Sequence, residues 1–209
     1  MEIAFLLFDG ITPLDAIGPF EVLGKIPGAK IRMLAKEKGE IRTKGQSLAM
    51  IADYSLAEVA EPEILVVPGG PGADAMAEDG AVTDWVSRAH ETTAWTTSVC
   101  TGALILGGAG VLKGLKATTH WRAMDDLAAF GAEATDQRVV RDGKVITAAG
   151  VSSGIDMALQ LAAEIAGEDI AKAIQLGIEY APEPPFDAGR YRDAPPERVE
   201  LVRSTLNRP

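Results

Sequence analysis

Cys100 is the residue of this chain whose type and position best suit covalent chemistry. It is the only cysteine among 209 residues, and it stands between a β-favouring run and a run of small residues typical of a helix. On such a turn its side chain would project from the end of a sheet, as the nucleophile of a hydrolase elbow does. The N–H groups and dipole of the following helix would lower the thiol pKa towards thiolate. A buried, unreactive thiol is the alternative.

Asp15 is the candidate proton carrier, because it lies in a short segment between a predicted strand and a predicted helix. Burial among apolar neighbours would raise the pKa of its carboxyl group, which could then exchange protons with a substrate or with the thiol. Those apolar neighbours are Leu14, Ile17 and Phe20. A helix N-cap is the structural alternative for Asp15, and Glu21 is the rival acid.

Two further features could assist Cys100. The glycine-rich residues 69–72 follow a buried apolar run and are first of all a tight turn. If they share an edge with Cys100, the exposed N–H groups of Gly69 and Gly70 could stabilise developing negative charge. His120 ends a predicted strand, where it is either a proton carrier or a hydrogen-bonded structural residue.

The elements that must position these residues alternate along the chain. Apolar runs predict buried strands at residues 3–8 and 64–68. Further strands are predicted at residues 30–35 and 95–99, with shorter β segments at residues 40–51, 116–120 and 138–147. Helices are predicted at residues 19–23, 82–90, 101–110, 122–130, 153–166, 168–180 and 197–206. This alternation predicts an α/β fold with a mostly parallel sheet and helices on both faces. Ligands of such sheets bind outside the carboxyl ends of the strands.

Composition narrows the class of protein. The net charge of −10 argues against a nucleic-acid partner, and no run approaches the ~20 apolar residues of a membrane span. The first residues lack the basic region of a secretory signal. One cysteine cannot form an intramolecular disulfide, so a cytoplasmic location is expected. Two histidines and one cysteine have no spacing typical of a zinc site, so no metal is expected.

Three motifs, in this order and spacing, resemble the ThiJ/PfpI superfamily, which has a class I glutamine amidotransferase-like fold. They are Pro68-Gly69-Gly70-Pro71-Gly72, Ser98-Val99-Cys100-Thr101-Gly102 and Ala117-Thr118-Thr119-His120-Trp121. Within the superfamily the chain is most similar to the bacterial isonitrile hydratases. That likeness rests on Leu14-Asp15-Ala16-Ile17-Gly18-Pro19, on the pair Cys100-Thr101, on Arg138-Val139-Val140-Arg141-Asp142-Gly143, on Gly154-Ile155-Asp156, and on Glu179-Tyr180-Ala181-Pro182-Glu183-Pro184-Pro185-Phe186.

The resemblance implies a flavodoxin-like three-layer sandwich with a nucleophile elbow. It implies that Cys100 is the nucleophile, that Asp15 is the general acid and base, and that Thr101 holds the substrate or a water. The expected reaction is the addition of water to an isonitrile through a thioimidate, without a metal or organic cofactor. The expected substrate-binding residues are Gly69, Gly70, Ile17, His120 and Trp121, with backbone groups of Gly70 and Thr101 forming an anion-binding notch.

One position departs from many relatives. Protease-like and chaperone-like members carry histidine directly after the cysteine, where this chain has Thr101. This difference disfavours a Cys-His-acid peptidase and leaves His120 as a second-rank candidate. Glyoxalase-like or deglycase-like chemistry on small aldehydes is the enzymatic alternative. A redox-sensing or ligand-binding protein is the non-enzymatic one.

The resemblance also implies the organisation of the chain. It covers nearly the whole sequence, so a single domain over residues 1–209 is expected. Residues 182–209 would be a proline-rich segment plus a last helix, packed on the surface. A homodimer is expected, with the segment that contains Asp15 near the subunit interface.

Overall fold

The computed structural model describes residues 1–43, 45 and 47–205. The chain forms two compact units, Met1–Ile178 and Glu179–Pro209. Seven strands of the described chain form one sheet in the first unit, in the order β10-β11-β7-β6-β1-β2-β5. They are β1 (Glu2–Leu6), β2 (Lys30–Ala35), β5 (Tyr54–Ser55), β6 (Ile64–Val67), β7 (Trp95–Val99), β10 (Val139–Asp142) and β11 (Val145–Ala148).

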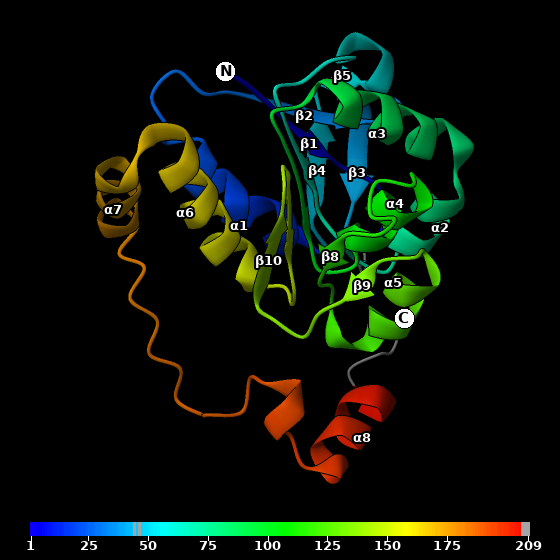
Figure 1. Cartoon of the computed structure of the whole chain (residues 1–209), viewed down its shortest axis with the longest axis vertical. Coiled ribbons are helices and arrows are strands. Elements are labelled where there is room, and N and C mark those ends of the chain that lie inside the picture. The colour runs from blue at the N-terminus through cyan, green and yellow to red at the C-terminus, as the bar shows by residue number, and fades with distance from the viewer. Residues whose placement is uncertain (44, 46, 206–209) are drawn as a thin grey trace. The chain divides into compact units, whose positions relative to one another are not determined.

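Neighbouring strands of this sheet are parallel except at one edge. There β10 and β11 form an antiparallel hairpin with Asp142-Gly143 at its turn, within the predicted β segment at residues 138–147. Helices α1 (Pro13–Leu23), α6 (Ser153–Ala166) and α7 (Glu168–Gly177) lie on one side of the sheet. Helices α2 (Ala73–Glu78), α3 (Gly80–Thr92), α4 (Gly102–Gly108) and α5 (Met124–Ala129) lie on the other (Figure 1). The predicted three-layer α/β fold is therefore confirmed.

The strand order brings three segments of the candidate site together at the carboxyl ends of the central strands. The chain passes from β1 to β2 in one direction and then returns to β6, β7 and β11 in the other, so the order reverses between β1 and β6. In open α/β sheets, ligand crevices lie at such a reversal. The segment after β1 carries Asp15, the turn after β6 carries Gly69 and Gly70, and β7 leads directly to Cys100.

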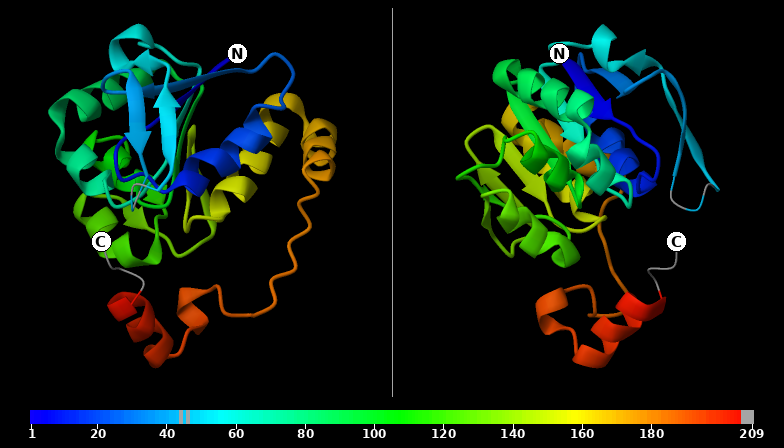
Figure 2. Two further views of the ribbon diagram at one scale, coloured as in Figure 1. Left: turned by 180° about the vertical axis from the view of Figure 1, so that it is seen from behind. Right: turned by 90° about the vertical axis from the view of Figure 1, so that its right-hand side faces the viewer.

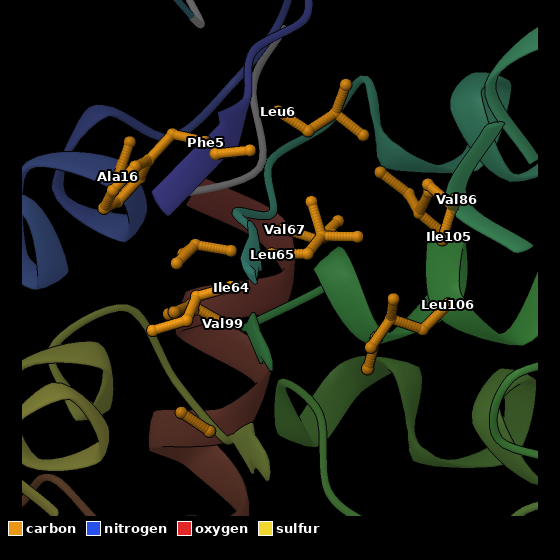
Figure 3. Close-up of a cluster of buried hydrophobic side chains, with 14 of the residues drawn as sticks. Phe5, Leu6, Ala16, Ile64, Leu65, Val67, Val86, Val99, Ile105 and Leu106 are labelled. Carbon is orange, nitrogen blue, oxygen red and sulfur yellow. The ribbon is translucent and has the colours of Figure 1, made fainter. Parts of the chain in front are cut away.

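Side chains on both faces of the central strands form the core. Phe5 of β1 faces Ala16 of α1, whereas Leu65 of β6 points towards Val86 of α3 and Ile105 of α4 (Figure 3). All five side chains are fully buried. Because strands buried on both faces read as continuous apolar runs, the sequence predicted these strands to within a few residues.

Two predicted elements differ from the structure. Helix α1 begins at Pro13 rather than at Pro19, because Pro13 occupies the first turn and Pro19 lies inside the helix. The predicted strand over residues 116–120 is reduced to β8 (Lys116–Ala117), which pairs with β9 (Glu133–Ala134) in a separate two-stranded sheet. Beyond β8, the N–H of Thr118 donates to the Thr147 hydroxyl at 2.8 Å and so leaves the strand ladder.

A small hairpin stands apart from the main sheet, where the sequence predicts short β segments at residues 40–51. It consists of β3 (Gly39–Arg42) and β4 (Ala49–Ala52), and it projects from the first unit (Figure 2, right). The end of the hairpin next to its turn is tied to the segment after β1: the N–H of Arg42 donates to Asp9 Oδ1 at 2.8 Å, and the N–H of Gly10 donates to the Arg42 carbonyl at 2.8 Å. The hairpin thus supports the backbone that leads to Asp15.

Residues 179–204 of the second unit, whose burial the structure describes, include no buried residue. This unit contains the short helix η4 (Tyr191–Asp193) and α8 (Pro196–Thr205). Leu206, the expected end of the last helix, lies outside the described residues. The expected packing of residues 182–209 stays a prediction. Within the described chain, no helix is at once long enough and apolar enough to cross a membrane.

Two glycines that begin helices allow a test of how tightly the elbow packs. A Cβ on Gly102, the first residue of α4, would overlap the carbonyl oxygen of Val67, whereas a Cβ on Gly80, the first residue of α3, meets nothing within 4 Å. We expect Gly102→Ala to lower the free energy of unfolding by on the order of 3 kcal/mol. Gly80→Ala should change it by less than about 1 kcal/mol. Urea unfolding measures both; equal midpoints would contradict this packing.

Candidate active site

Cys100 occupies a strained turn between β7 and α4. Its φ angle is 56°, in the left-handed region that non-glycine residues seldom adopt, as expected of a nucleophile elbow. Its N–H donates to the Ala148 carbonyl of β11 at 2.9 Å, and the residue is 5% exposed. The predicted elbow is therefore present, and the neighbouring strand holds it in place.

Asp15 lies inside the protein, not at the start of its helix. It is the third residue of α1 and is 0% exposed, and Thr12 stands at the N-cap position. The Gly69 N–H donates to Asp15 Oδ2 at 3.0 Å. The N-cap alternative is therefore wrong, because the carboxyl group turns away from its own helix and accepts a hydrogen bond from the turn after β6.

The carboxyl group of Asp15 and the thiol of Cys100 interact directly. Burial raises the pKa of Asp15 from 3.8 to about 7, although hydrogen bonds from the Gly69 N–H and the Cys100 thiol oppose the rise. The Oδ1 atom is buried and has no hydrogen-bond partner among the described residues. The predicted increase in the pKa of Asp15 is thus present.

The expected lowering of the thiol pKa is wrong. Burial, followed by the negative charge of Asp15, raises the pKa of Cys100 to about 12, while the N–H and hydroxyl of Thr101 act in the opposite direction. Helix α4 has only seven residues, and its dipole does not offset this desolvation. Cys100 is therefore a neutral thiol at pH 7 that needs a base to remove its proton.

The glycine turn positions side chains rather than presenting free N–H groups. The Gly70 N–H donates to Thr101 Oγ1 at 2.9 Å, and the Thr101 hydroxyl is 3.1 Å from the Gly70 carbonyl, so the two residues are joined in both directions. The Gly69 N–H is engaged by Asp15. The Gly69 and Gly70 N–H groups therefore both have partners within the protein, and the expected anion-binding notch of Gly70 and Thr101 stays a prediction.

Gly69 and Gly70 must lack side chains for this arrangement to form. A Cβ on Gly69 would lie 2.5 Å from the Thr101 nitrogen. Gly70 has a φ of 145°, and a Cβ there would lie 2.5 Å from the Thr12 nitrogen. Close approach of three backbone segments explains the glycine pair better than anion binding does.

His120 and Trp121 form a pair of rings whose centroids are 5.4 Å apart. The Arg122 N–H donates to His120 Nδ1 at 3.3 Å, and burial, with Arg122 nearby, lowers the pKa of His120 to about 4. His120 is thus neutral at pH 7. Neither of these contacts involves Cys100, but the His120 Cδ2 atom lies 4.0 Å from the Cβ that Gly150 would carry, just beyond β11. A substrate-binding role for the pair stays a prediction.

The apolar neighbours expected to desolvate Asp15 are themselves partly exposed. Leu14 is 42% exposed, and Ile17 and Phe20 are each 37% exposed, although the Phe20 ring also packs edge-on against the buried Phe5. The contacts of the Asp15 carboxyl group are instead with Gly69 and Cys100. Ile17 remains close in sequence to the site, and its expected contact with substrate stays a prediction.

One contact of the site was missed from the sequence. Thr119 donates its hydroxyl to the Cys100 carbonyl at 2.8 Å and is 1% exposed. The available signal was its place beside His120 in the Ala-Thr-Thr-His-Trp motif, but a threonine there is equally typical of a strand. Among the described residues, no group of three or more His, Cys, Asp or Glu side chains could hold a metal ion.

The arrangement supplies a thiol, an acid that titrates near neutral pH and a hydroxyl within one buried cluster. A carboxylate beside a neutral thiol can accept its proton as the sulfur attacks an electrophile, and can return that proton later. The cluster is therefore suited to covalent addition and proton transfer on a small molecule.

Comparison with known proteins identifies relatives of this site and fold. A model of the DJ-1/PfpI family matches residues 1–164. Isonitrile hydratase from Pseudomonas putida is 39% identical over 203 residues, which cover 97% of this chain and 89% of that protein. Deglycase PfpI from Pyrococcus furiosus is 29% identical over 148 residues, or 70% of this chain and 89% of that protein. The crystal structure of a ThiJ/PfpI family protein from Pseudomonas syringae has a TM-score of 0.92 at 39% identity, covering 97% of this chain and 86% of that one.

The raised pKa of Asp15 predicts how stability depends on pH. Between about 4 and 7 the folded protein binds a proton at Asp15 that the unfolded chain has released, so the free energy of unfolding falls as pH rises through this window. Asp15→Asn removes this loss, which amounts to as much as about 4 kcal/mol. In urea unfolding from pH 4 to pH 8, the free energy of unfolding of the variant should increase relative to that of the wild type as pH rises to about 7. Parallel curves would show that the carboxyl group titrates normally.

Proposed function

The chain belongs to the DJ-1/PfpI family, and we propose that it is an enzyme that hydrates isonitriles to N-substituted formamides. The observation that carries this proposal is the buried contact between Cys100, a neutral thiol, and Asp15, whose pKa is about 7. The relative from Pseudomonas putida, named isonitrile hydratase, supports the choice of substrate.

The first step forms a carbon–sulfur bond. Asp15 accepts the thiol proton as the Cys100 sulfur attacks the terminal carbon of the isonitrile, and Asp15 then gives this proton to the same carbon. The thiol and the isonitrile thus combine into a thioimidate without loss of any atom. A pKa near 7 suits Asp15 to both transfers, because the carboxyl group can lose or gain a proton at little cost near neutral pH.

The second step consumes water. Asp15, again ionised, takes one proton from a water whose oxygen adds to the thioimidate carbon, and gives this proton to the nitrogen. The resulting adduct collapses to the formamide as the carbon–sulfur bond breaks, and its hydroxyl proton passes through Asp15 to the sulfur of Cys100. Covalent catalysis divides one difficult addition into two easier ones.

Thr101 supports the charge on sulfur. Its hydroxyl has one proton, which it can donate either to the Gly70 carbonyl or to Cys100. The hydroxyl turns towards the sulfur as the thiolate develops and then returns to the carbonyl. Threonine in place of histidine directly after the cysteine supports hydration over a peptidase mechanism. Gly69, Gly70, Ile17, His120 and Trp121 complete the proposed substrate contacts.

Deglycase-like or glyoxalase-like chemistry on small aldehydes is the second candidate. The similarity to the Pyrococcus furiosus deglycase favours it, and a buried thiol with a neighbouring acid can also attack a carbonyl carbon. The smaller share of the chain in that similarity, 70% against 97% for the hydratase, makes it the weaker proposal.

The proposed enzyme is a cytoplasmic homodimer. The single cysteine supports a reducing compartment. The exposed apolar side chains of Leu14, Ile17 and Phe20 on α1 support a subunit interface beside the site, because apolar groups gathered on one helix favour association.

The isonitrile reaction is tested with cyclohexyl isocyanide and quantification of the formamide. We expect turnover by the wild type, none by Cys100→Ala, and at least about a 100-fold loss with Asp15→Asn. Glu21→Gln is the matched control, since Glu21 is an exposed carboxylate on the same helix, and it should keep full activity. The value of kcat/KM should rise with pH through about 7, because the ionised carboxylate is the base.

The outcomes of this assay separate the two candidate reactions. Absence of formamide with the wild type, or undiminished turnover by Cys100→Ala, would overturn hydration. Consumption of methylglyoxal by the wild type, together with absence of formamide, would establish the aldehyde reaction instead.

The homodimer is tested by light scattering. We expect the wild type to have twice the mass of one chain and Leu14→Glu to shift towards the monomer, because a buried, unpaired carboxylate opposes association. Leu176→Glu, at an apolar residue of α7 that is 80% exposed, should remain dimeric. A monomeric wild type, or a dimeric Leu14→Glu, would exclude an interface at this face.

A further inference from the structure

Thr119 holds the carbonyl oxygen of the candidate nucleophile. Its hydroxyl lies 2.8 Å from the Cys100 oxygen, and the side chain is 1% exposed, so water does not replace this contact. The other donor to the same oxygen, the Ala103 N–H, is 3.4 Å away. A bond of that length is weak. The Thr119 hydroxyl is therefore the stronger of the two partners.

The carbonyl group of Cys100 is part of a planar peptide unit whose N–H contacts the Cys100 sulfur. It belongs to the peptide joining Cys100 to Thr101, and the N–H at the other end of this peptide donates to the Cys100 sulfur and favours its ionised form. The atoms of a peptide unit lie in one plane. Fixing the oxygen of this peptide therefore fixes the direction in which its N–H points.

The segment that carries Thr119 is itself anchored to the sheet. The Thr118 N–H donates to the Thr147 hydroxyl of β11 at 2.8 Å, and the Ala148 carbonyl of the same strand accepts the N–H of Cys100 at 2.9 Å. Strand β11 thus serves as the common support for both sides of the elbow. This support matters because Cys100 has a φ of 56°, a conformation that the local sequence does not favour.

We propose that Thr119 is a positioning residue for Cys100: its hydroxyl fixes the peptide whose N–H stabilises negative charge on the sulfur. The inference depends on the proposed role of Cys100 as the nucleophile. Thr119 acts through the peptide and does not touch the substrate. A hydrogen bond to a carbonyl also strengthens donation from the N–H of the same unit, so the hydroxyl contributes polarisation as well as geometry.

The chain offers a matched control on the strand that leads to the elbow. Thr97 of β7 is also fully buried and donates its hydroxyl to a backbone carbonyl, that of Leu65, at 3.0 Å. Replacing either threonine with valine removes one buried hydroxyl and keeps the side-chain shape. Both variants lose a similar contact, but only Thr119→Val releases the peptide beside the sulfur.

The experiment measures alkylation of the full-length protein by iodoacetamide, followed by intact-mass spectrometry. Because Cys100 is the only cysteine, one mass increment reports one site. We expect Thr119→Val to slow alkylation at pH 8 by about five- to tenfold, since a hydrogen bond to a charged group is weakened. Thr97→Val should stay within twofold of the wild type, and Thr119→Ser should restore most of the rate because serine keeps the hydroxyl.

Further readouts separate positioning from loss of structure. Among the described residues, Asp15 is the one titratable group that shifts the pKa of the thiol, and none of the substitutions alters it. The pH range over which the alkylation rate rises should therefore shift to higher values in Thr119→Val alone. If that variant does not fold, Thr119→Ala takes its place. With cyclohexyl isocyanide, kcat should fall while KM stays nearly constant.

Several results would overturn the inference. They are an alkylation rate for Thr119→Val within twofold of Thr97→Val, a faster rate than that of the wild type, or failure of serine to restore it. The alkylation arm does not use isonitrile. A protein that lacks hydratase activity but shows the expected alkylation pattern would therefore refute the proposed reaction and retain the role of Thr119.

Discussion

Burial of the Asp15 carboxyl group against the Cys100 thiol is the constraint around which the candidate site is built. Removing a carboxyl group from water costs free energy, and the raised pKa of Asp15 expresses that cost. The Gly69 N–H offsets part of it by donating to Oδ2. Two acidic groups that share a dry space hold at most one negative charge at neutral pH. In the proposed reaction, a proton can therefore pass from the thiol to the carboxylate without a second negative charge forming.

The backbone around the pair follows from this constraint. Three segments after β1, β6 and β7 must approach one another closely enough to exclude water, and the absence of side chains at Gly69 and Gly70 permits that approach. The turn then binds Asp15 through one N–H and Thr101 through the next. The glycine turn thus binds both residues proposed to assist Cys100, Asp15 and Thr101. The reversal of strand order places this turn beside them.

Much of this could be predicted from the sequence because it depends on local patterns. Apolar runs located the central strands, and the change from strand-like to helix-like residues located the elbow at Cys100. Family resemblance located Asp15 and Thr101. The actual bonds of the glycine turn could not be predicted, because an N–H that faces a ligand and one that faces Asp15 require the same glycine.

The thiol pKa was mispredicted for a physical reason. Sequence reveals the helix that follows Cys100, whose dipole favours thiolate, but burial and the charge of Asp15 depend on segments far apart in the chain. The outward direction of Leu14 and Ile17 likewise depends on where α1 begins, and Pro13 moved that start six residues earlier than Pro19 implied. Long-range packing, rather than local preference, decided both outcomes.

The 0% exposure of Asp15 has an evolutionary consequence. Selection for thermal tolerance alone would discard this carboxyl group, since a neutral isostere fills the same space without the desolvation cost. Its persistence in a lineage would therefore record selection for chemistry rather than for folding. In an engineered library screened only for heat resistance, this position would be among the first to lose its charge, and the survivors would be robust proteins with an impaired site.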